Sequence, residues 1–157
     1  MDVIDRFSGE YSFLSNFYPV KIYYEGLEFS STEHAYQAAK TTNVNLRYPF
    51  SFDSTHPVMS ASQAKKAGQN LFIRSDWEIV KIPIMEKLVE QKFMENPQLG
   101  EILKETFPNE LIEENNWGDR FWGKVNGNGK NWLGIILMNT RQKLRKDDEY
   151  LSMWDGW

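Results

Sequence analysis

The sequence predicts an α+β fold, a compact and predominantly helical single domain with one small antiparallel hairpin. Apolar residues recur at helical spacing in residues 73–96 and again in the segment that follows Asn131. Residues 19–29 instead alternate apolar and polar side chains on either side of a Glu25-Gly26 turn, which is typical of a hairpin. A chain of 157 residues is long enough to bury one hydrophobic core without disulfides or structural metals. We therefore expect a single domain over residues 1–157.

The first helix is expected in the segment STEHAYQAAK, residues 31–40. Ser30 and Glu33 have the spacing of a capping box. At about 100° per residue, polar side chains with chemical capacity fall on one face of this helix, and small side chains line the opposite face. The polar stripe consists of Glu33, Tyr36, Gln37 and Lys40, and the small residues are Ala35, Ala38 and Ala39. The alanine face would let another element approach closely.

A loop and a second capped helix come next. Residues 43–59 mix aromatic and polar side chains without a period, so we predict a loop, long enough to serve as a lid or substrate loop. Ser60 and Gln63 suit another capping box, and they open a helix over residues 61–70 that Gly68 weakens.

The next helix lies within residues 73–96, where Pro83 marks either a kink or the true start. Asn96 and Pro97 suit the N-cap and the first position of a short helix that runs through Lys104.

The remaining segment, residues 106–131, is rich in Gly and Trp and is expected to be a loop with a short strand at 111–113. Its stretch GKVNGNGKN suits either a phosphate cradle or a plain Gly/Asn turn. Asn131 introduces the last helix, whose expected buried stripe consists of Leu133, Ile136, Leu137, Thr140 and Leu144.

Composition excludes several kinds of chemistry. The chain has no cysteine, which rules out disulfides, thiolate metal sites and a cysteine nucleophile. His34 and His56 are too few for a typical zinc site unless carboxylates complete it, so we expect no metal and no cofactor. No apolar run approaches about 18 residues, and the charged first twenty residues are unlike a signal peptide, so we expect a cytoplasmic protein without membrane contact.

Charge and aromatic content point toward a nucleotide-sized ligand. The net charge of −4 argues against broad attraction to nucleic acid but leaves room for a local basic pocket. Aromatic residues make up 15% of the chain. Several tryptophans lie near charged residues, and large rings beside charges are what a nucleobase or ribose pocket needs. These tryptophans are Trp77, Trp117, Trp122 and Trp132.

Co-ordered segments of the chain resemble the NADAR (NAD and ADP-ribose associated) domain family, also called YbiA-like. In order and approximate spacing they are FLSNFYP (13–19), STEHAYQAAK (31–40), RSDW (74–77), EKLVEQKF (86–93), WGDRFWG (117–123) and GKNWLGIILMNTR (129–141). The resemblance runs from about Phe7 to Leu144. It implies a compact α+β fold and an N-glycosidase that acts at a ribose anomeric carbon. Family members cleave phosphoribosylamino-pyrimidine intermediates of riboflavin synthesis or remove ADP-ribose from guanine in nucleic acid.

The resemblance places Glu33 and Lys40 in the catalytic motif. Breaking a C–N bond at an anomeric carbon builds positive charge on the ribose, so the site needs a nearby carboxylate and a donor for the departing base. Lys40 either protonates or orients the leaving group, or attacks the ring-opened sugar to give a Schiff base, which requires a neutral amine. Family context also favours Asp119 as a catalytic residue that holds ribose hydroxyls or activates water.

Each of these catalytic residues also has a plain structural interpretation. Glu33 suits a capping box, Lys40 a solvated charge at a helix end, and Asp119 a turn that bonds its own backbone. Because a mere nucleotide reader needs neither a carboxylate at the anomeric carbon nor a buried amine, the presence of both Glu33 and Lys40 favours an enzyme. The alternative is a non-catalytic module that binds ADP-ribose or a related nucleotide.

The expected substrate-binding residues have competing local roles as well. Trp77 and Trp122 suit stacking on the base or core packing, and Arg74 suits a bidentate phosphate contact or a salt bridge with Asp76. Asn16 and Asn131 suit ligand hydrogen bonds or turn and cap roles. His34 lies one step off the catalytic face and is interpreted as structural. The full set of expected substrate-binding residues is Asn16, Tyr36, Gln37, Arg74, Trp77, Trp122 and Asn131.

The expected partners are the substrate alone, either a small-molecule nucleotide or ADP-ribosylated nucleic acid, without an obligate protein partner. The tail DDEYLSMWDGW lies beyond the resemblance, within residues 146–157, and carries Trp154 and Trp157. It is expected either to dock on the domain or to bind a partner.

Overall fold

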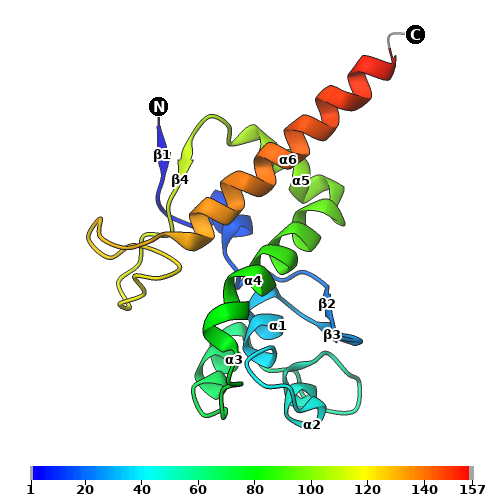
Figure 1. The fold of residues 1–157 in the computed structure, drawn as a ribbon, viewed down its shortest axis with the longest axis vertical. Helices are drawn as coiled ribbons and strands as arrows, with labels where there is room; N and C mark the ends of the chain where they lie inside the picture. Colours follow the sequence, from blue (N-terminus) through cyan, green and yellow to red (C-terminus); the bar gives the residue numbers. More distant parts are fainter. Residues whose placement is uncertain (1, 156–157) are drawn as a thin grey trace. The chain divides into compact units, whose positions relative to one another are not determined.

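A computed structural model describes residues 2–155 of the chain (Figure 1). The contacts divide the chain into two units, unit 1 with residues 1–14 and 93–157 and unit 2 with residues 15–92. The predicted α+β class is confirmed, because helices dominate and the antiparallel sheet is small. That one domain spans residues 1–157 stays a prediction.

Unit 2 begins with the predicted hairpin. Strands β2 (Ile22–Tyr24) and β3 (Leu27–Phe29) pair antiparallel with Ile22 opposite Phe29. Glu25 and Gly26 form the turn with φ of 48° and 81°, the left-handed conformation that two-residue hairpins favour. Because Ile22 and Phe29 are both 0% exposed, this pair anchors the hairpin in the core of the unit.

Helix α1 (Thr32–Ala38) lies at the centre of unit 2 (Figure 1). It contacts helix α3 (Ala61–Gly68), the 3-10 helix η2 (Tyr48–Phe50) and both strands of the hairpin. The predicted Ser30–Glu33 capping box is wrong. Ser31 is the N-cap, and its hydroxyl accepts from the backbone N–H of His34. With two adjacent serines, spacing alone could not decide which one the extended backbone places at the cap. Every residue of α1 is buried, so both the polar and the alanine faces are covered.

The loop predicted over residues 43–59 is partly wrong. It contains α2 (Val44–Arg47) and the 3-10 helix η2 (Tyr48–Phe50). Asn43 caps α2 by accepting from the Asn45 backbone N–H at 2.9 Å. Elements of one turn are too short to show a helical period, which is why the pattern indicated a loop.

The other helices of unit 2 follow the predictions closely. Helix α3 (Ala61–Gly68) has the predicted Ser60–Gln63 capping box, with both reciprocal hydrogen bonds present. Helix α4 (Trp77–Met94) contains Pro83 in its interior, so the alternative that Pro83 starts the helix is wrong. Pro83 has no N–H to donate to the Ile79 carbonyl one turn earlier, and Ile79 is 79% exposed.

Unit 1 contains a parallel strand pair that the sequence analysis did not include. Strand β1 (Val3–Ile4) pairs with β4 (Glu110–Leu111), close to the strand predicted at 111–113. The 3-10 helix η1 (Gly9–Leu14) also lies here. Strands of two residues carry too little alternation for a pattern to reveal them.

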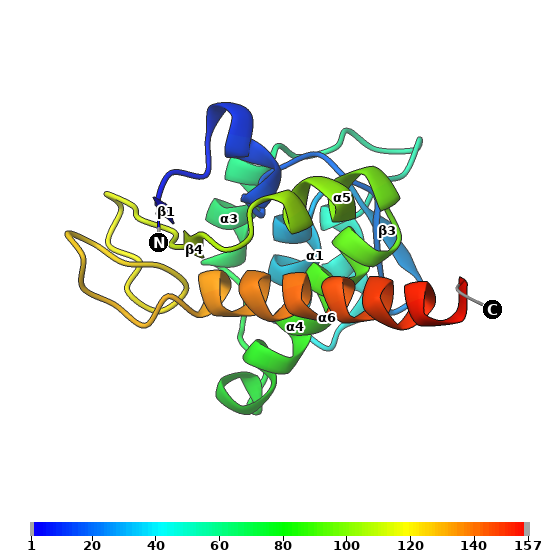
Figure 2. The same ribbon diagram turned by 90° about the horizontal axis from the view of Figure 1, so that it is seen from above.

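Two helices pack side by side in unit 1, α5 (Pro97–Glu105) and α6 (Trp132–Asp155), as both views show (Figures 1 and 2). Pro97 occupies the first turn of α5, as predicted, although Asn96 makes no side-chain cap hydrogen bond. The predicted stripe of α6 is buried from Leu133 to Thr140, and Leu144 is half-buried.

The C-terminal tail continues α6 to Asp155. Its large apolar side chains are exposed, with Tyr150 and Trp154 in edge-to-face contact at 6.0 Å between ring centroids. Trp157 lies outside the described residues. Whether the tail binds a partner stays a prediction.

Candidate active site

The polar stripe of α1 holds a buried carboxylate. Gln37 Nε2 donates to Glu33 Oε1 at 2.7 Å, one helical turn away. Glu33 is 7% exposed and Gln37 is 4% exposed. The i, i+4 spacing that predicted a shared face therefore produces a direct contact that orients the carboxylate.

Gln37 in turn is fixed by helix α3. A Cβ atom added at Gly68 would lie 1.9 Å from Gln37 Oε1, so the glycine lets the two helices approach closely at this point. Gln37 Oε1 is buried without a hydrogen-bond partner among the described residues. Gly68, which weakens the helix in propensity terms, therefore has a packing role against the candidate site.

Lys40 follows the C-terminal end of α1 and is half-buried. Its ammonium lies 5.7 Å from the centroid of the Tyr36 ring. Burial lowers the pKa of Lys40 from its usual value, Glu33 opposes this shift, and Lys65 adds to it. A lowered pKa makes the neutral amine that a nucleophile needs more accessible near physiological pH, and it makes the protonated amine a stronger acid toward a leaving group.

Aromatic rings pack beside the amine. Tyr36 and Trp77 lie 5.2 Å apart between ring centroids with a tilt of 51°, and both side chains are buried. This contact belongs to core packing, the competing interpretation of Trp77 from the sequence. Stacking of Trp77 on a substrate base stays a prediction.

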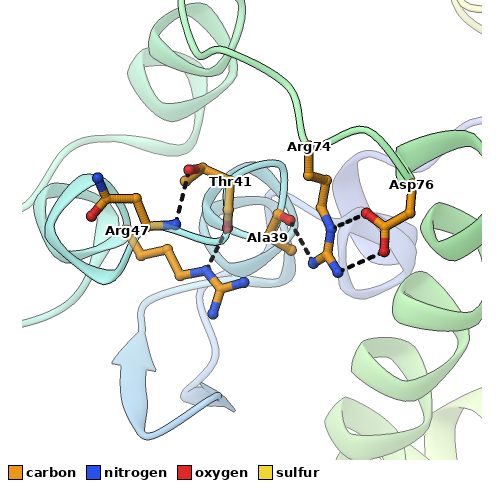
Figure 3. Close-up of polar contacts among 6 residues, drawn as sticks. Ala39, Thr41, Arg47, Arg74 and Asp76 are labelled. Atoms are coloured by element: carbon orange, nitrogen blue, oxygen red, sulfur yellow. Dashed lines mark hydrogen bonds and ion pairs between the residues drawn. The ribbon is translucent and has the colours of Figure 1, made fainter.

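Two guanidinium groups hold the backbone around Lys40 (Figure 3). Arg47 Nε donates to the Thr41 carbonyl at 2.7 Å, and Arg74 Nη1 donates to the Ala39 carbonyl at 3.4 Å. The Arg74 backbone N–H also donates to the Lys40 carbonyl at 2.8 Å. These donors satisfy carbonyls at a helix end and fix the position from which Lys40 projects.

Arg74 is also paired with Asp76 through two hydrogen bonds of 2.6 and 3.0 Å (Figure 3). This is the local salt bridge that the sequence left as an alternative to phosphate binding. The pair lowers the pKa of Asp76, chiefly through the hydrogen bond from Arg74. A phosphate contact by Arg74 stays a prediction, and a ligand would have to share the guanidinium with Asp76.

Asn16 is joined to α1 by its backbone. The Glu33 N–H donates to the Asn16 carbonyl at 3.0 Å, and Asn16 Nδ2 donates to Met85 Sδ at 3.5 Å. The side chain is 8% exposed. The segment FLSNFYP therefore supports the first turn of α1, and ligand contact by Asn16 stays a prediction.

His34 has the structural role expected from the sequence. Its Nε2–H donates to the Met59 carbonyl at 2.6 Å, which leaves Nδ1 to accept from the Ser31 hydroxyl at 2.6 Å. The ring is 3% exposed. His34 thus links the N-cap of α1 to the segment that precedes α3.

Asp119 and Trp122 belong to unit 1. Asp119 Oδ1 accepts from the backbone N–H groups of Phe121 and Trp122 at 3.0 and 2.9 Å. Asn115 binds the Asp119 backbone from the other side, with its Oδ1 accepting at 3.0 Å and its Nδ2 donating at 2.8 Å. This is the Asp turn that the sequence left as the alternative. Catalysis by Asp119 and stacking by Trp122 stay predictions.

The side-chain oxygen and nitrogen of Asn131 both form hydrogen bonds within unit 1. Its Nδ2 donates to the Leu111 carbonyl at 2.9 Å, and its Oδ1 accepts from the Glu113 N–H at 3.0 Å. The side chain thereby ties β4 to the start of α6, and its ligand role stays a prediction. In the nearby glycine-rich stretch, Val125 and Asn128 pair across a two-residue turn, the plain turn interpretation.

The structure thus brings together seven of the predicted site residues within unit 2, and three lie in unit 1. The first group is Asn16, Glu33, Tyr36, Gln37, Lys40, Arg74 and Trp77, and the second is Asp119, Trp122 and Asn131. The sequence analysis missed Arg47 and Gly68 as supports of the site. For Gly68 there was a signal, a glycine inside a capped helix.

Neither a cluster of metal ligands nor a membrane-spanning helix occurs in the part of the chain that the structure describes. Within residues 2–155, no group of three or more His, Asp or Glu side chains is placed to hold a metal ion. In the same range, no helix has the length and apolarity needed to cross a bilayer.

The α+β fold places the buried Glu33 carboxylate in α1 and the Lys40 amine, whose pKa is lowered by burial, just after that helix. The chain belongs to the NADAR domain family, which matches residues 5–145. The family resemblance expected from the sequence is therefore confirmed.

Similar proteins place the chain among enzymes. It is 34% identical over 142 residues to the N-glycosidase YbiA of Shigella boydii, covering 87% of this chain and 84% of that protein. It is 33% identical over 138 residues to the N-glycosidase Npun_R5314 of Nostoc punctiforme, covering 86% of each. These relatives confirm, at the level of the family, the prediction of a hydrolase that acts on N-glycosyl bonds.

A third relative and a solved structure complete the comparison. The chain is 34% identical over 143 residues to the riboflavin biosynthesis protein VVA0006 of Vibrio vulnificus, but it spans only 37% of that longer protein. The NMR structure of Escherichia coli YbiA aligns with a TM-score of 0.80 at 30% identity, covering 94% of this chain and 87% of that one. The YbiA-like fold is thereby confirmed.

Proposed function

We propose that this protein hydrolyses the bond between C1′ of a phosphorylated ribose and a nitrogen of a base or amino-pyrimidine. The observation that carries the proposal is the arrangement at α1, where the Gln37 amide orients the buried Glu33 carboxylate and burial lowers the pKa of Lys40 just beyond the helix. The two substrate classes that share this bond are ADP-ribosylated guanine in nucleic acid and phosphoribosylamino-pyrimidines of riboflavin synthesis.

The chemistry assigns separate tasks to the two groups. As the C1′–N bond breaks, its electron pair goes to the leaving nitrogen and positive charge develops at C1′ and the ring oxygen. A carboxylate at Glu33 stabilises that charge electrostatically. On one route Lys40 protonates the leaving nitrogen, and water adds to C1′ and loses a proton to complete the hydrolysis. On the other route the neutral amine of Lys40 attacks the ring-opened C1′ and expels the base as it forms a Schiff base, which water then hydrolyses.

Incubation with each substrate tests this proposal. ADP-ribosylated guanine DNA and, separately, the phosphoribosylamino-pyrimidine are mixed with the protein, and free base is followed by mass spectrometry. Lys40→Met, which keeps the chain length of the side chain but lacks the amine, is the matched control. Release of base by the wild type alone supports the proposal. Binding of either compound without release by any form of the protein contradicts it and favours a non-catalytic reader of ADP-ribose.

A further inference from the structure

Lys92 is a buried lysine that the chemistry above does not use. It lies near the C-terminal end of α4 and is 1% exposed, among the most completely buried large side chains of the described residues. Its ammonium lies 5.4 Å from the centroid of the Tyr18 ring. Burial lowers the pKa of Lys92 to about 7. Removing an amine from water is costly, so a purely structural position would be filled more cheaply by an apolar side chain.

One hydrogen bond of Lys92 leads, through a turn, to the first turn of α1. Lys92 Nζ donates to the Ser15 carbonyl at 2.9 Å. The same carbonyl accepts from the Tyr18 N–H at 3.1 Å, which closes a turn with Asn16 and Phe17 at its centre. The Asn16 carbonyl then accepts from the backbone N–H of Glu33 at 3.0 Å.

We propose that Lys92 is a positioning residue for Glu33, acting through the turn at residues 15–18. The amine fixes the orientation of the Ser15 peptide, the turn presents the Asn16 carbonyl, and that carbonyl holds the backbone from which the Glu33 side chain projects. The chain of contacts joins two of the family-like segments, FLSNFYP and EKLVEQKF, and gives EKLVEQKF a role in the reaction that it otherwise lacks.

The position of Glu33 matters because the rate of a catalysed reaction depends steeply on where the reacting groups lie. Displacing a reacting group by about 1 Å can cost on the order of 100-fold in rate. Glu33 must lie at the anomeric carbon, whereas the binding of the base and phosphates depends on other side chains. A loosened turn is therefore expected to lower kcat with little change in KM. This inference rests on the proposed function for its catalytic readout.

Lys92→Met tests the inference, with Lys87→Met on the same helix as the control. Met has a similar length and suits a buried site, but it cannot donate to Ser15. We expect the melting temperature of Lys92→Met to equal or exceed that of the wild type, while kcat falls by about tenfold or more and KM stays within about twofold. Lys87 is exposed, so its variant should match the wild type in all three measurements.

Hydrogen exchange at the Glu33 amide separates this inference from the proposed function. The amide is protected by the Asn16 carbonyl in the wild type, and in Lys92→Met its exchange should accelerate relative to amides in the middle of α4. A folded Lys92→Met with unchanged Glu33 exchange would overturn the positioning role, whatever the activity shows. Absence of turnover in the wild type would instead contradict the proposed function. The exchange rate of the Glu33 amide would then still decide whether Lys92 positions Glu33.

A second variant covers the case in which Lys92→Met fails to fold. The chain has no cysteine, so Lys92→Cys carries a unique thiol. Alkylation of the unfolded variant with 2-bromoethylamine, followed by refolding, restores an amine of nearly the original length. The inference requires that aminoethylation recover kcat and slow Glu33 exchange, whereas alkylating the thiol with iodoethane, which leaves an ethyl group without a donor, should recover neither. Equal recovery with both reagents would overturn it.

Discussion

Lys40 experiences opposing influences on its charge. Burial and the charge of Lys65 lower its pKa, and the carboxylate of Glu33 raises it. Burial is the largest cause, so the neutral form becomes accessible at a lower pH than for a free lysine. A reaction that needs the neutral amine should accelerate as pH rises through this lowered pKa.

Substitution and trapping at Lys40 distinguish its two candidate roles. If a Schiff base forms, borohydride added during turnover should reduce it, inactivate the protein and add a ribose-containing mass to the peptide with Lys40. Lys40→Arg should then be inactive, because a guanidinium does not lose its proton. Peptide mass spectrometry and turnover assays measure both results. Substantial activity in Lys40→Arg without a trapped adduct would instead assign Lys40 an electrostatic or hydrogen-bonding role.

The sequence predicted the residues of α1 better than their surroundings. The spacing of Glu33, Gln37 and Lys40 predicted a shared face, and the structure shows the Gln37–Glu33 contact directly. Spacing could not reveal that Arg47 donates to the Thr41 carbonyl. That contact depends on α2, which has only one turn and is too short to show a helical period in the sequence. Nor could spacing reveal Lys92 as buried, because lysine is usually an exposed residue.

At the scale of elements, the contact between α1 and α3 depends on Gly68. Glycine is worse than alanine inside a helix by about 1 kcal/mol, so α3 alone would gain from Gly68→Ala. A Cβ at this position would however overlap Gln37 Oε1 and also lie 3.3 Å from Gln37 Cβ. The side chain that would have to move is the one that orients Glu33.

We therefore expect Gly68→Ala to lower the free energy of unfolding by about 1–3 kcal/mol and to lower turnover as well, because overpacking outweighs helix propensity. Denaturant unfolding and the turnover assay measure the two effects. Ala67→Gly, in the same turn of α3, is the control and should lose stability through propensity alone while retaining turnover. Greater stability with full activity in Gly68→Ala would show that Gln37 relaxes freely.

Element boundaries show where local patterns stop being informative. The capping box predicted at Ser60 and Gln63 was correct because no other N-cap residue adjoins Ser60. At α1, by contrast, Ser30 and Ser31 are both suitable N-cap residues. The pairing of β1 with β4 joins residues more than one hundred positions apart, and its register depends on tertiary packing rather than on either short segment.

For the molecule as a whole, Lys92 should dominate one part of the pH dependence of stability. Its pKa is about 7 in the folded protein, and an unfolded lysine titrates near 10.4. Between these values the unfolded chain binds more protons, so stability should rise with pH, by up to about 1.4 kcal/mol per pH unit from this group. Below pH 7 both states are protonated, and the full cost of the buried charge remains.

The comparison of Lys92→Met with the wild type isolates this contribution. The stability advantage of the variant should be largest near pH 6 to 7 and should shrink as pH rises toward 10. Urea unfolding at a series of pH values measures the difference, and other titrating groups cancel in it. A difference that does not depend on pH would show that Lys92 has an ordinary pKa in the folded protein.

Chelation tests the expectation that no metal takes part. With no cysteine and few histidines, activity should survive incubation with EDTA. The substrate assay under otherwise identical conditions provides the measurement. Loss of activity that one divalent ion restores would reveal a carboxylate site that neither the spacing of the sequence nor the described residues indicate.

The central claim is that Glu33 acts in breaking the C1′–N bond, and Glu33→Gln tests it most directly. The change is nearly isosteric and keeps an oxygen that can accept from Gln37, so stability should fall by about 1 kcal/mol at most. Turnover of the substrate that the wild type cleaves should be abolished, with ligand affinity largely retained, because the amide cannot offset positive charge at C1′. Normal turnover in a folded Glu33→Gln would contradict the catalytic assignment.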